Sequence, residues 1–196
     1  MLNGLAFGIA IVLMALGLTI IFGLLDVINM SHGEFFAVGA YAGFALLGAG
    51  VNFWIAVALV PLMMLPLGIL AERVLIRQVF DSADRHTLTL LLTLGLSMIL
   101  YDSLKLIFGP NPVRPETPIA GGVEVLGVFL PAYRMFLIFL GGAIIAAVWA
   151  IIYKTSLGAM IRAAAFDRNM ASSLGVPVST VYAATFAFGT ALAGLA

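Results

Sequence analysis

The stretch LNGLAFGIAIVLMALGLTIIFGLL, from Leu2 to Leu25, contains only two clearly polar side chains, those of Asn3 and Thr19. A helix needs about 20 mostly apolar residues to cross the hydrocarbon core of a bilayer, so this run is long enough to span it. The rest of the chain has the same character, because 63% of its 196 residues are hydrophobic and 9% are charged. Soluble domains are about half apolar and roughly a quarter charged. The composition therefore predicts a polytopic membrane protein.

Further apolar runs predict an all-α fold, a polytopic transmembrane helical bundle of about six membrane segments. After the first run, the expected segments are residues 35–51, 53–71, 88–108, 133–153 and 178–196. Residues 109–134 are rich in proline and glycine, which indicates a loop, and residues 123–130 alternate enough for a short strand or hairpin. We expect residues 1–196 to form a single transmembrane domain. The last run stops at Ala196 without a charged or aromatic anchor, which predicts a chain that is incomplete at its C-terminus.

The scarce charges gather in two connections with a positive excess. These are residues 72–87, with Arg73, Arg77 and Arg85, and residues 154–177, with Lys154, Arg162 and Arg168. Cytoplasmic loops of membrane proteins are enriched in Lys and Arg, so we expect both connections on the cytoplasmic side. Two spans separate them, which makes the two assignments consistent. Counting back then places the N-terminus outside, unless the polar insert at residues 26–34 lies within the membrane as a break between two half-helices, which changes the count by one.

Several classes of function have no support in the sequence. The net charge is zero, which gives no electrostatic reason to bind nucleic acid. The chain has no cysteine and two histidines far apart, so a metal site is not expected. No phosphate-cradling G-x-x-x-x-G-K-[ST] loop and no catalytic triad occur. We therefore expect no catalytic residues, no cofactor and no ATP hydrolysis by this chain itself.

The sequence GLLDVINMSHGEFF, residues 23–36, interrupts the apolar character of the first half. It contains Asp26, Asn29, Ser31, His32 and Glu34. Ionisable groups inside a bilayer usually face a cavity or a partner, and a broken helix near the midplane exposes backbone that can contact a substrate. The alternative is a plain loop at the membrane surface, and the residues alone do not separate the two.

Two other patterns near this stretch have simpler interpretations. Gly39 and Gly43 have the small-xxx-small spacing that lets membrane helices approach closely, and we expect them to serve packing and not to line a pore. Glu72, beside Arg73, is interpreted as part of a helix end whose charges reach into the cytoplasmic interface.

The second basic connection, residues 154–177, has the pattern of two short helices joined by a bend. Asp167 is a suitable cap for the second helix. Gly175 is a natural C-terminal stop, and Pro177 prevents continuation. Such a pair would make a rigid cytoplasmic knob that fits a groove of a partner protein. The alternative is a surface loop without a partner.

Four motifs, in order, resemble the permeases of branched-chain amino-acid ABC transporters. They are FGLLDVINMSHGEFFAVGAY at 22–41, ERVLIR at 72–77, LLTLGLSMIL at 91–100 and SLGAMIRAAAFDRNMASSLGVPVSTVYAATFAFGTALAGLA at 156–196. The resemblance covers essentially the whole chain and is closest to the H-type permease subunit. The chain departs from the family at Gln78, where proline is common, and at Phe80, where a basic residue is expected.

The resemblance implies a multi-pass permease of the bacterial inner membrane, itself not an enzyme. Its partners would be a second related permease, two ATP-binding cassette subunits and a periplasmic binding protein that delivers leucine, isoleucine or valine. Residues 154–177 would be the coupling-helix region that docks on the ATPase, with Gly158, Arg162, Asp167, Ala171 and Gly175 as the coupling positions. The substrate pathway would pass Asn29, Ser31, His32 and Glu34. Family members continue with further helices beyond the point that corresponds to Ala196.

Two alternatives remain open on the sequence alone. Urea and short-chain amide permeases share the same signatures, so the transported substrate is not fixed. A membrane-embedded enzyme that uses His32 and Glu34 is a second alternative, and it predicts activity without any ATPase partner.

Overall fold

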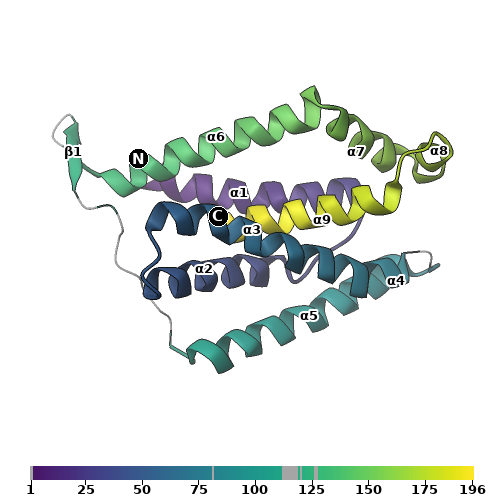
Figure 1. The fold of residues 1–196 in the computed structure, drawn as a ribbon, viewed down its shortest axis with the longest axis horizontal. Helices are drawn as coiled ribbons and strands as arrows, with labels where there is room; N and C mark the ends of the chain where they lie inside the picture. Colours follow the sequence, from purple (N-terminus) through teal and green to yellow (C-terminus); the bar gives the residue numbers. More distant parts are fainter. Residues whose placement is uncertain (1, 81, 112–118, 120, 126–127) are drawn as a thin grey trace.

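The computed structural model describes residues 2–80, 82–111, 119, 121–125 and 128–196, and it is a bundle of long helices (Figure 1). The long helices are α1 (Leu2–Leu25), α2 (His32–Gly48), α3 (Phe53–Ala71), α5 (Arg85–Phe108), α6 (Ala132–Lys154) and α9 (Val178–Leu195). The short elements are the π-helical turn η1 (Glu72–Ile76), α4 (Arg77–Val79), β1 (Gly122–Val125), β2 (Val128–Pro131), α7 (Ser156–Phe166) and α8 (Arg168–Ser173). The predicted helical bundle is confirmed, with one small β-hairpin in the described part of the chain.

Five of the described helices are long and apolar enough to cross a membrane. They cover Gly4–Leu25, Phe53–Val79, Arg85–Phe108, Ala132–Lys154 and Val178–Leu195. The 17 residues of α2 lie at the lower limit of the length that a bilayer requires, and α2 packs alongside the others as a sixth segment. This agrees with the expectation of about six segments.

The helices alternate in direction, and the two basic connections lie at the same end of the bundle. In Figure 1, η1 and α4, which precede α5, and the α7–α8 pair both lie at the right-hand end. The hairpin lies at the opposite end, with β1 and β2 antiparallel and Gly122 paired with Pro131. The two basic connections, which the sequence predicts on the same side of the membrane, therefore lie at the same end of the bundle. The predicted hairpin in the 109–134 connection is present.

Helix α9 forms the centre of the bundle, although it comes last in the chain. It lies between α1 and α3 in Figure 1 and also contacts α2. In α9, 67% of an 18-residue window is buried, against 6% in α5. Small residues make this possible, because a Cβ atom at Gly189 would lie 2.9 Å from the backbone oxygen of Gly17. Backbones can approach this closely only where side chains are absent.

The two glycines of the predicted packing motif have different surroundings. A Cβ atom at Gly39 would overlap the backbone of Gly194, so α2 and α9 touch there backbone to backbone. A Cβ atom at Gly43 would lie 3.6 Å from the Val60 side chain, which is an ordinary contact. Packing is thus confirmed as the role of Gly39, whereas Gly43 has room for a methyl group.

We expect Gly39→Ala to destabilise the protein and Gly43→Ala to be nearly neutral. Forcing extra atoms into a close-packed site costs about 1–3 kcal/mol. Thermal unfolding of the purified protein in detergent measures the difference. Equal melting temperatures for the two variants would contradict the close contact between α2 and α9.

The interpretation of Glu72 as an interfacial charge is wrong. Its exposed fraction is 2%, and its Oε2 atom has no hydrogen-bond partner among the described residues. The helix does not end at Ala71 but continues through η1, which contacts α5 and α9. The side chain is therefore enclosed by neighbouring helices, while Arg73 and Arg77 are exposed.

Candidate functional site: a polar link inside the bundle

Helix α1 ends because Asp26 adopts a left-handed backbone conformation, with φ of 53°. Its N–H still donates to the Phe22 carbonyl at 2.9 Å, which completes the last helical turn. Aspartate tolerates this conformation better than most residues because its short side chain can form local hydrogen bonds. The chain then continues without helical structure until α2 begins at His32. We call residues 26–31 the polar link.

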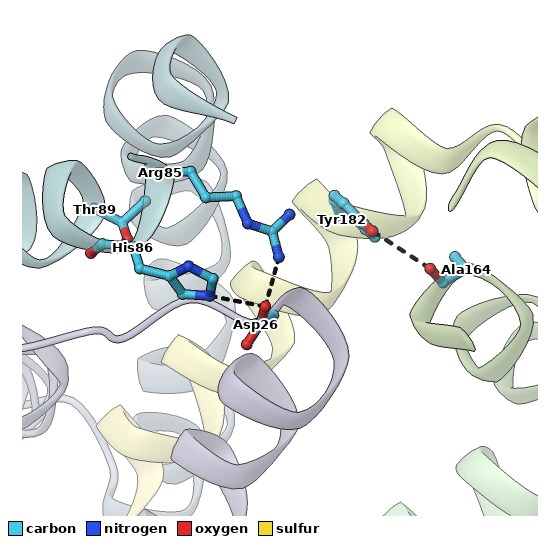
Figure 2. A network of polar contacts seen from close by, with 6 residues as sticks. All are labelled: Asp26, Arg85, His86, Thr89, Ala164 and Tyr182. Atoms are coloured by element: carbon cyan, nitrogen blue, oxygen red, sulfur yellow. Dashed lines mark hydrogen bonds and ion pairs between the residues drawn. The ribbon is translucent and has the colours of Figure 1, made fainter. Parts of the chain in front are cut away.

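The polar link starts at the end of the bundle, where Asp26 is held by the first turn of α5. The carboxylate oxygen Oδ2 accepts hydrogen bonds from Arg85 at 2.6 Å and from His86 at 2.8 Å (Figure 2). Sequence reasoning did not find this pairing, because the partners lie 59 and 60 positions away and no local spacing connects them.

From Asp26 the polar link runs into the bundle along α5. The hydroxyl of Thr93 lies 3.1 Å from the Met30 nitrogen and 3.2 Å from the Ile28 oxygen. Thr93 is eight residues beyond Arg85 in α5, which corresponds to about 12 Å of helix. The polar link therefore descends well below the end of the bundle.

The polar link ends near the middle of α1. The Nε2 atom of His32 lies 3.0 Å from the carbonyl oxygen of Met14, which is close to the midpoint of the Leu2–Leu25 helix. The chain reverses direction here, as a loop does, because α2 runs back antiparallel to α1 (Figure 1). It also lies inside the bundle, as a broken helix does. The structure thus combines features of the two alternatives that the sequence leaves open.

The polar side chains of this region are buried. The exposed fractions are 4% for Asn29, 0% for Ser31 and 4% for His32, and Glu34 is half-buried. The Asn29 amide oxygen accepts hydrogen bonds from the Ser31 nitrogen at 3.1 Å and the Ser31 hydroxyl at 2.6 Å. These bonds fix the turn that leads into α2.

Three polar groups remain available around this turn. The Nδ2 atom of Asn29 and the Nδ1 atom of His32 are buried without a hydrogen-bond partner among the described residues. The Glu34 carboxylate accepts one hydrogen bond, from the Ser97 hydroxyl of α5 at 3.1 Å, and has further acceptor capacity. Buried polar groups without partners are costly and call for an explanation. A polar ligand that reaches this region would supply the missing partners.

Asp26 has an electrostatic environment that stabilises its charged form. Burial raises its pKa, but hydrogen bonds and positive charge from His86 and Arg85 outweigh this effect and hold the pKa below its ordinary value of 3.8. The Asp26 side chain remains 55% exposed, so water screens the pair with Arg85. The pair positions the start of the polar link and adds little stability.

We expect Asp26→Asn to lower stability by at most about 1 kcal/mol, because it removes only a screened ion pair and keeps the left-handed conformation accessible. Asp26→Ala should cost about 1–2 kcal/mol more, because alanine is strained there. Since the native pKa is lowered, the ion-pair contribution is present above pH 3.8 and is lost as the pH falls through the native value. Unfolding temperatures measured from pH 7 to pH 3 test this. The gap between wild type and Asp26→Asn should begin to narrow below pH 3.8, and a gap of the same size at pH 7 and at pH 3 would contradict it.

A second site feature is the knob formed by α7 and α8, at the same end of the bundle as Asp26. Thr155 caps α7 by accepting from the Gly158 nitrogen at 3.1 Å, and Asp167 caps α8 by accepting from the Met170 nitrogen at 2.9 Å. Gly175 ends the knob with φ of 86°. The predicted pair of short helices is confirmed, with Asp167 as the cap and Gly175 as the stop.

The other three predicted coupling residues also shape the knob. A Cβ atom at Gly158 would overlap the carbonyl oxygens of Ile151 and Ile152, so α7 turns away tightly from α6. Arg162 donates to the carbonyl oxygen of Ile152. Ala171 is 2% exposed and belongs to the main core. These three residues contact α6 or the core and so fix the shape of the knob. Other residues of the knob form its outward surface.

The outward surface of the knob carries three large apolar side chains. Phe166, Met170 and Leu174 are exposed by 92%, 61% and 76%, and they follow one another at spacings of four residues. Sequence analysis did not single them out. The signal was present in their spacing, but it was not distinguishable from a buried helical face.

Phe80 joins the knob to the rest of the bundle. Its ring lies 4.9 Å from the ring of Tyr182, and the guanidinium carbon of Arg168 in α8 lies 4.6 Å from its centroid. Tyr182 in turn donates to the carbonyl oxygen of Ala164 in α7 at 3.4 Å (Figure 2). Phe80, which stands where the family has a basic residue, thus packs its ring against Arg168 of the knob.

Comparisons with known proteins identify the family of the chain. Residues 1–196 match the family described as branched-chain amino acid transport system / permease component. The chain is 28% identical over 210 residues to the high-affinity branched-chain amino acid transport system permease protein LivH of Salmonella typhimurium, and equally to LivH of Escherichia coli K12. It is 27% identical over 212 residues to the permease protein BraD of Pseudomonas aeruginosa. Each alignment covers 100% of this chain and 68% of the relative. No solved structure gives a significant match.

Proposed function

The chain belongs to the branched-chain amino acid transport system permease family, and from this premise we propose that it forms part of the translocation pathway of an ATP-driven importer for branched-chain amino acids. It would act in a bacterial inner membrane with a second related permease, two ATP-binding subunits and a periplasmic binding protein. The observation that carries the proposal is the polar link, which brings buried polar groups to the middle of an otherwise apolar bundle.

The polar groups around the link suit the charged ends of an amino acid. An amide N–H, such as that of Asn29 Nδ2, can donate to a substrate carboxylate, and the Glu34 carboxylate can accept from an ammonium group. His32 Nδ1 offers a further hydrogen-bonding atom to the substrate. The hydrogen bond from Ser31 to Asn29 fixes the turn that positions Asn29 and His32. An aliphatic side chain would then contact the apolar walls that dominate the bundle. The similar permeases LivH and BraD are named for branched-chain amino acids, which favours leucine, isoleucine and valine over urea or amides.

The contacts of the polar link suggest how access could alternate. The link is bound to α5 through Thr93, and the first turn of α2, which follows the link, is bound to α5 through Glu34 and to α1 through His32. A movement of α5 relative to α1 would pull on both sides of the link and change which polar groups are exposed. In this scheme the partner ATPases supply the energy for that movement, and this chain supplies the hinge.

We expect Glu34→Gln and His32→Ala, in the complete transporter, to reduce leucine uptake about tenfold or more while assembly is unchanged. Glu34→Gln removes the charge but keeps an oxygen that can accept from Ser97. Asp102→Asn is the matched control, because it neutralises an exposed carboxylate on α5. Uptake of radiolabelled leucine, with valine or urea as competitor, gives the measurement, and co-purification reports assembly.

Full uptake in both variants would remove the polar link from the pathway. Competition by urea and not by valine would instead support the alternative substrate class.

We further propose that the knob couples this chain to its ATPase partner. Its exposed apolar side chains are Phe166 at the end of α7, Met170 in α8 and Leu174 at the end of α8, and they suit a hydrophobic groove on a partner. The capped ends of α7 and α8 and the contacts of Phe80 give the knob a fixed shape. A rigid surface loses little conformational entropy on binding, which favours docking.

We expect Leu174→Asp to weaken association with the ATPase subunits at least tenfold, because it places a charge in an apolar contact. Ser172→Asp adds the same charge at an exposed polar position of α8 and should have little effect. Pull-down of the ATPase subunits at graded salt concentration measures both variants. Equal retention of the two would show that the apolar surface does not carry the docking.

A further inference from the structure

Phe80, which directly follows α4, lies between the knob and the first turn of α5. Its side chain is 7% exposed. The guanidinium carbon of Arg168, in α8, lies 4.6 Å from the centroid of the Phe80 ring, and that of Arg85, the first residue of α5, lies 5.3 Å from the same centroid. Both distances are within the range in which an aromatic ring attracts a cation. One buried ring therefore contacts a charge of the knob and a charge of α5.

Arg85 extends this contact to the polar link. Besides lying near the Phe80 ring, it donates a hydrogen bond of 2.6 Å to Oδ2 of Asp26, the residue at which α1 ends and the polar link begins (Figure 2). A continuous series of side-chain contacts therefore leads from the knob to the start of the polar link. We call this series the arginine relay, and its members are Arg168, Phe80, Arg85 and Asp26.

The last contact of the arginine relay is held only weakly. The side chains of Asp26 and Arg85 are 55% and 32% exposed, so water screens the pair and can replace either partner. An open cleft of about 480 Å³ lies beside the pair, lined by the last turn of α1 and by Ala164, Ala165 and Arg168 of the knob. Separation of Asp26 from Arg85 would therefore expose both groups to water and leave neither of them buried without a partner.

Two other connections join the knob to the bundle near Asp26. Tyr182 of α9 packs its ring 4.9 Å from that of Phe80 and donates a long hydrogen bond of 3.4 Å to the carbonyl oxygen of Ala164. Helix α7 also contacts α1 directly. The hydrogen bonds of the Asp26 carboxylate, however, go to Arg85 and His86 of α5. The arginine relay is thus the connection that ends on the carboxylate itself.

We propose that Phe80 is a positioning residue for transport, which transmits a movement of the knob to the Asp26–Arg85 pair. The inference rests on the proposed function, in which the knob docks on an ATP-binding subunit. When that subunit moves the knob, Arg168 draws the Phe80 ring with it, and the ring displaces Arg85 from Asp26. The start of α5 then separates from the end of α1, and the polar link opens at the knob end of the bundle. Such coupling requires contacts with two discrete arrangements, which the paired and separated states of Asp26 and Arg85 supply.

Pulsed electron paramagnetic resonance measures the separation in the complete transporter, reconstituted with cysteine-free partner subunits. The chain itself contains no cysteine, so Thr19→Cys and Thr87→Cys place one spin label on α1 and one on the first turn of α5, both at exposed positions. We expect the distance between the labels to increase when ATP binds. The increase should be lost in Phe80→Leu, which removes the ring and keeps an apolar side chain. It should also be lost in Arg168→Gln, which removes the charge from an exposed position and leaves the core intact.

Leucine uptake and ATP hydrolysis, measured in the same proteoliposomes, separate transmission from a simple loss of stability. Phe80→Leu should lower the uptake per ATP hydrolysed at least about fivefold, while the ATP-binding subunits still co-purify. Phe186→Leu is the matched control, because the Phe186 ring is fully buried and packs on Phe35, and it should leave this ratio unchanged. Phe80→Tyr keeps the aromatic face and should retain coupling. Tyr182→Phe removes only the hydrogen bond to Ala164 and should retain it as well.

The outcomes distinguish the arginine relay from the proposed function. An unchanged ATP-dependent increase in Phe80→Leu or in Arg168→Gln would overturn the relay, and so would an equal loss of uptake per ATP in Phe186→Leu. A wild-type transporter that takes up leucine without any change in the distance would also overturn it. A wild-type transporter that shows the increase but takes up no leucine would instead refute the proposed substrate and support the relay.

Discussion

The hydroxyl of Thr93 permits a non-helical segment to exist inside this bundle. In a membrane, backbone groups that leave a helix must find partners within the protein, because no water is present to bind them. Thr93 is fully buried, and its oxygen lies within 3.2 Å of the Ile28 carbonyl oxygen and the Met30 nitrogen. It accepts a hydrogen bond from the Met30 N–H, while its single proton has the Thr89 carbonyl oxygen at 2.8 Å as its nearest acceptor. Without Thr93, the Met30 N–H would lose the partner that it has outside a helix.

The central position of α9 is a second constraint on the architecture. The side chains of Phe186, Ala193 and Thr190 are completely buried, and they face helices that come much earlier in the chain. The contacts between α9 and α1, α2 and α3 use glycine on one or both sides. The earlier helices therefore cannot reach their final packing until α9 has been made. The basic knob precedes α9 directly, so its position is linked to the core.

Much of the fold could be predicted from the sequence because it depends on local physics. Long apolar runs predict spans, and the caps at Asp167 and Gly175 predict the ends of the knob helix. The candidate site was predictable only as a cluster of polar residues. Its geometry depends on partners in α1 and α5, and no local spacing reveals that His32 meets Met14 or that Asp26 meets Arg85. The interpretation of Glu72 was wrong for a related reason. A helix end has the same sequence pattern whether it meets water or another helix.

The junction of α6 and α7 has a mechanical consequence. Arg162 and the tight turn at Gly158 join the two helices into one stiff corner. Helix α6 has 23 residues, so it extends about 35 Å from that corner to the hairpin. Helix α6 also packs on α1. A displacement of the knob would therefore be transmitted, as through one rigid unit, along α6 to the hairpin end of the bundle.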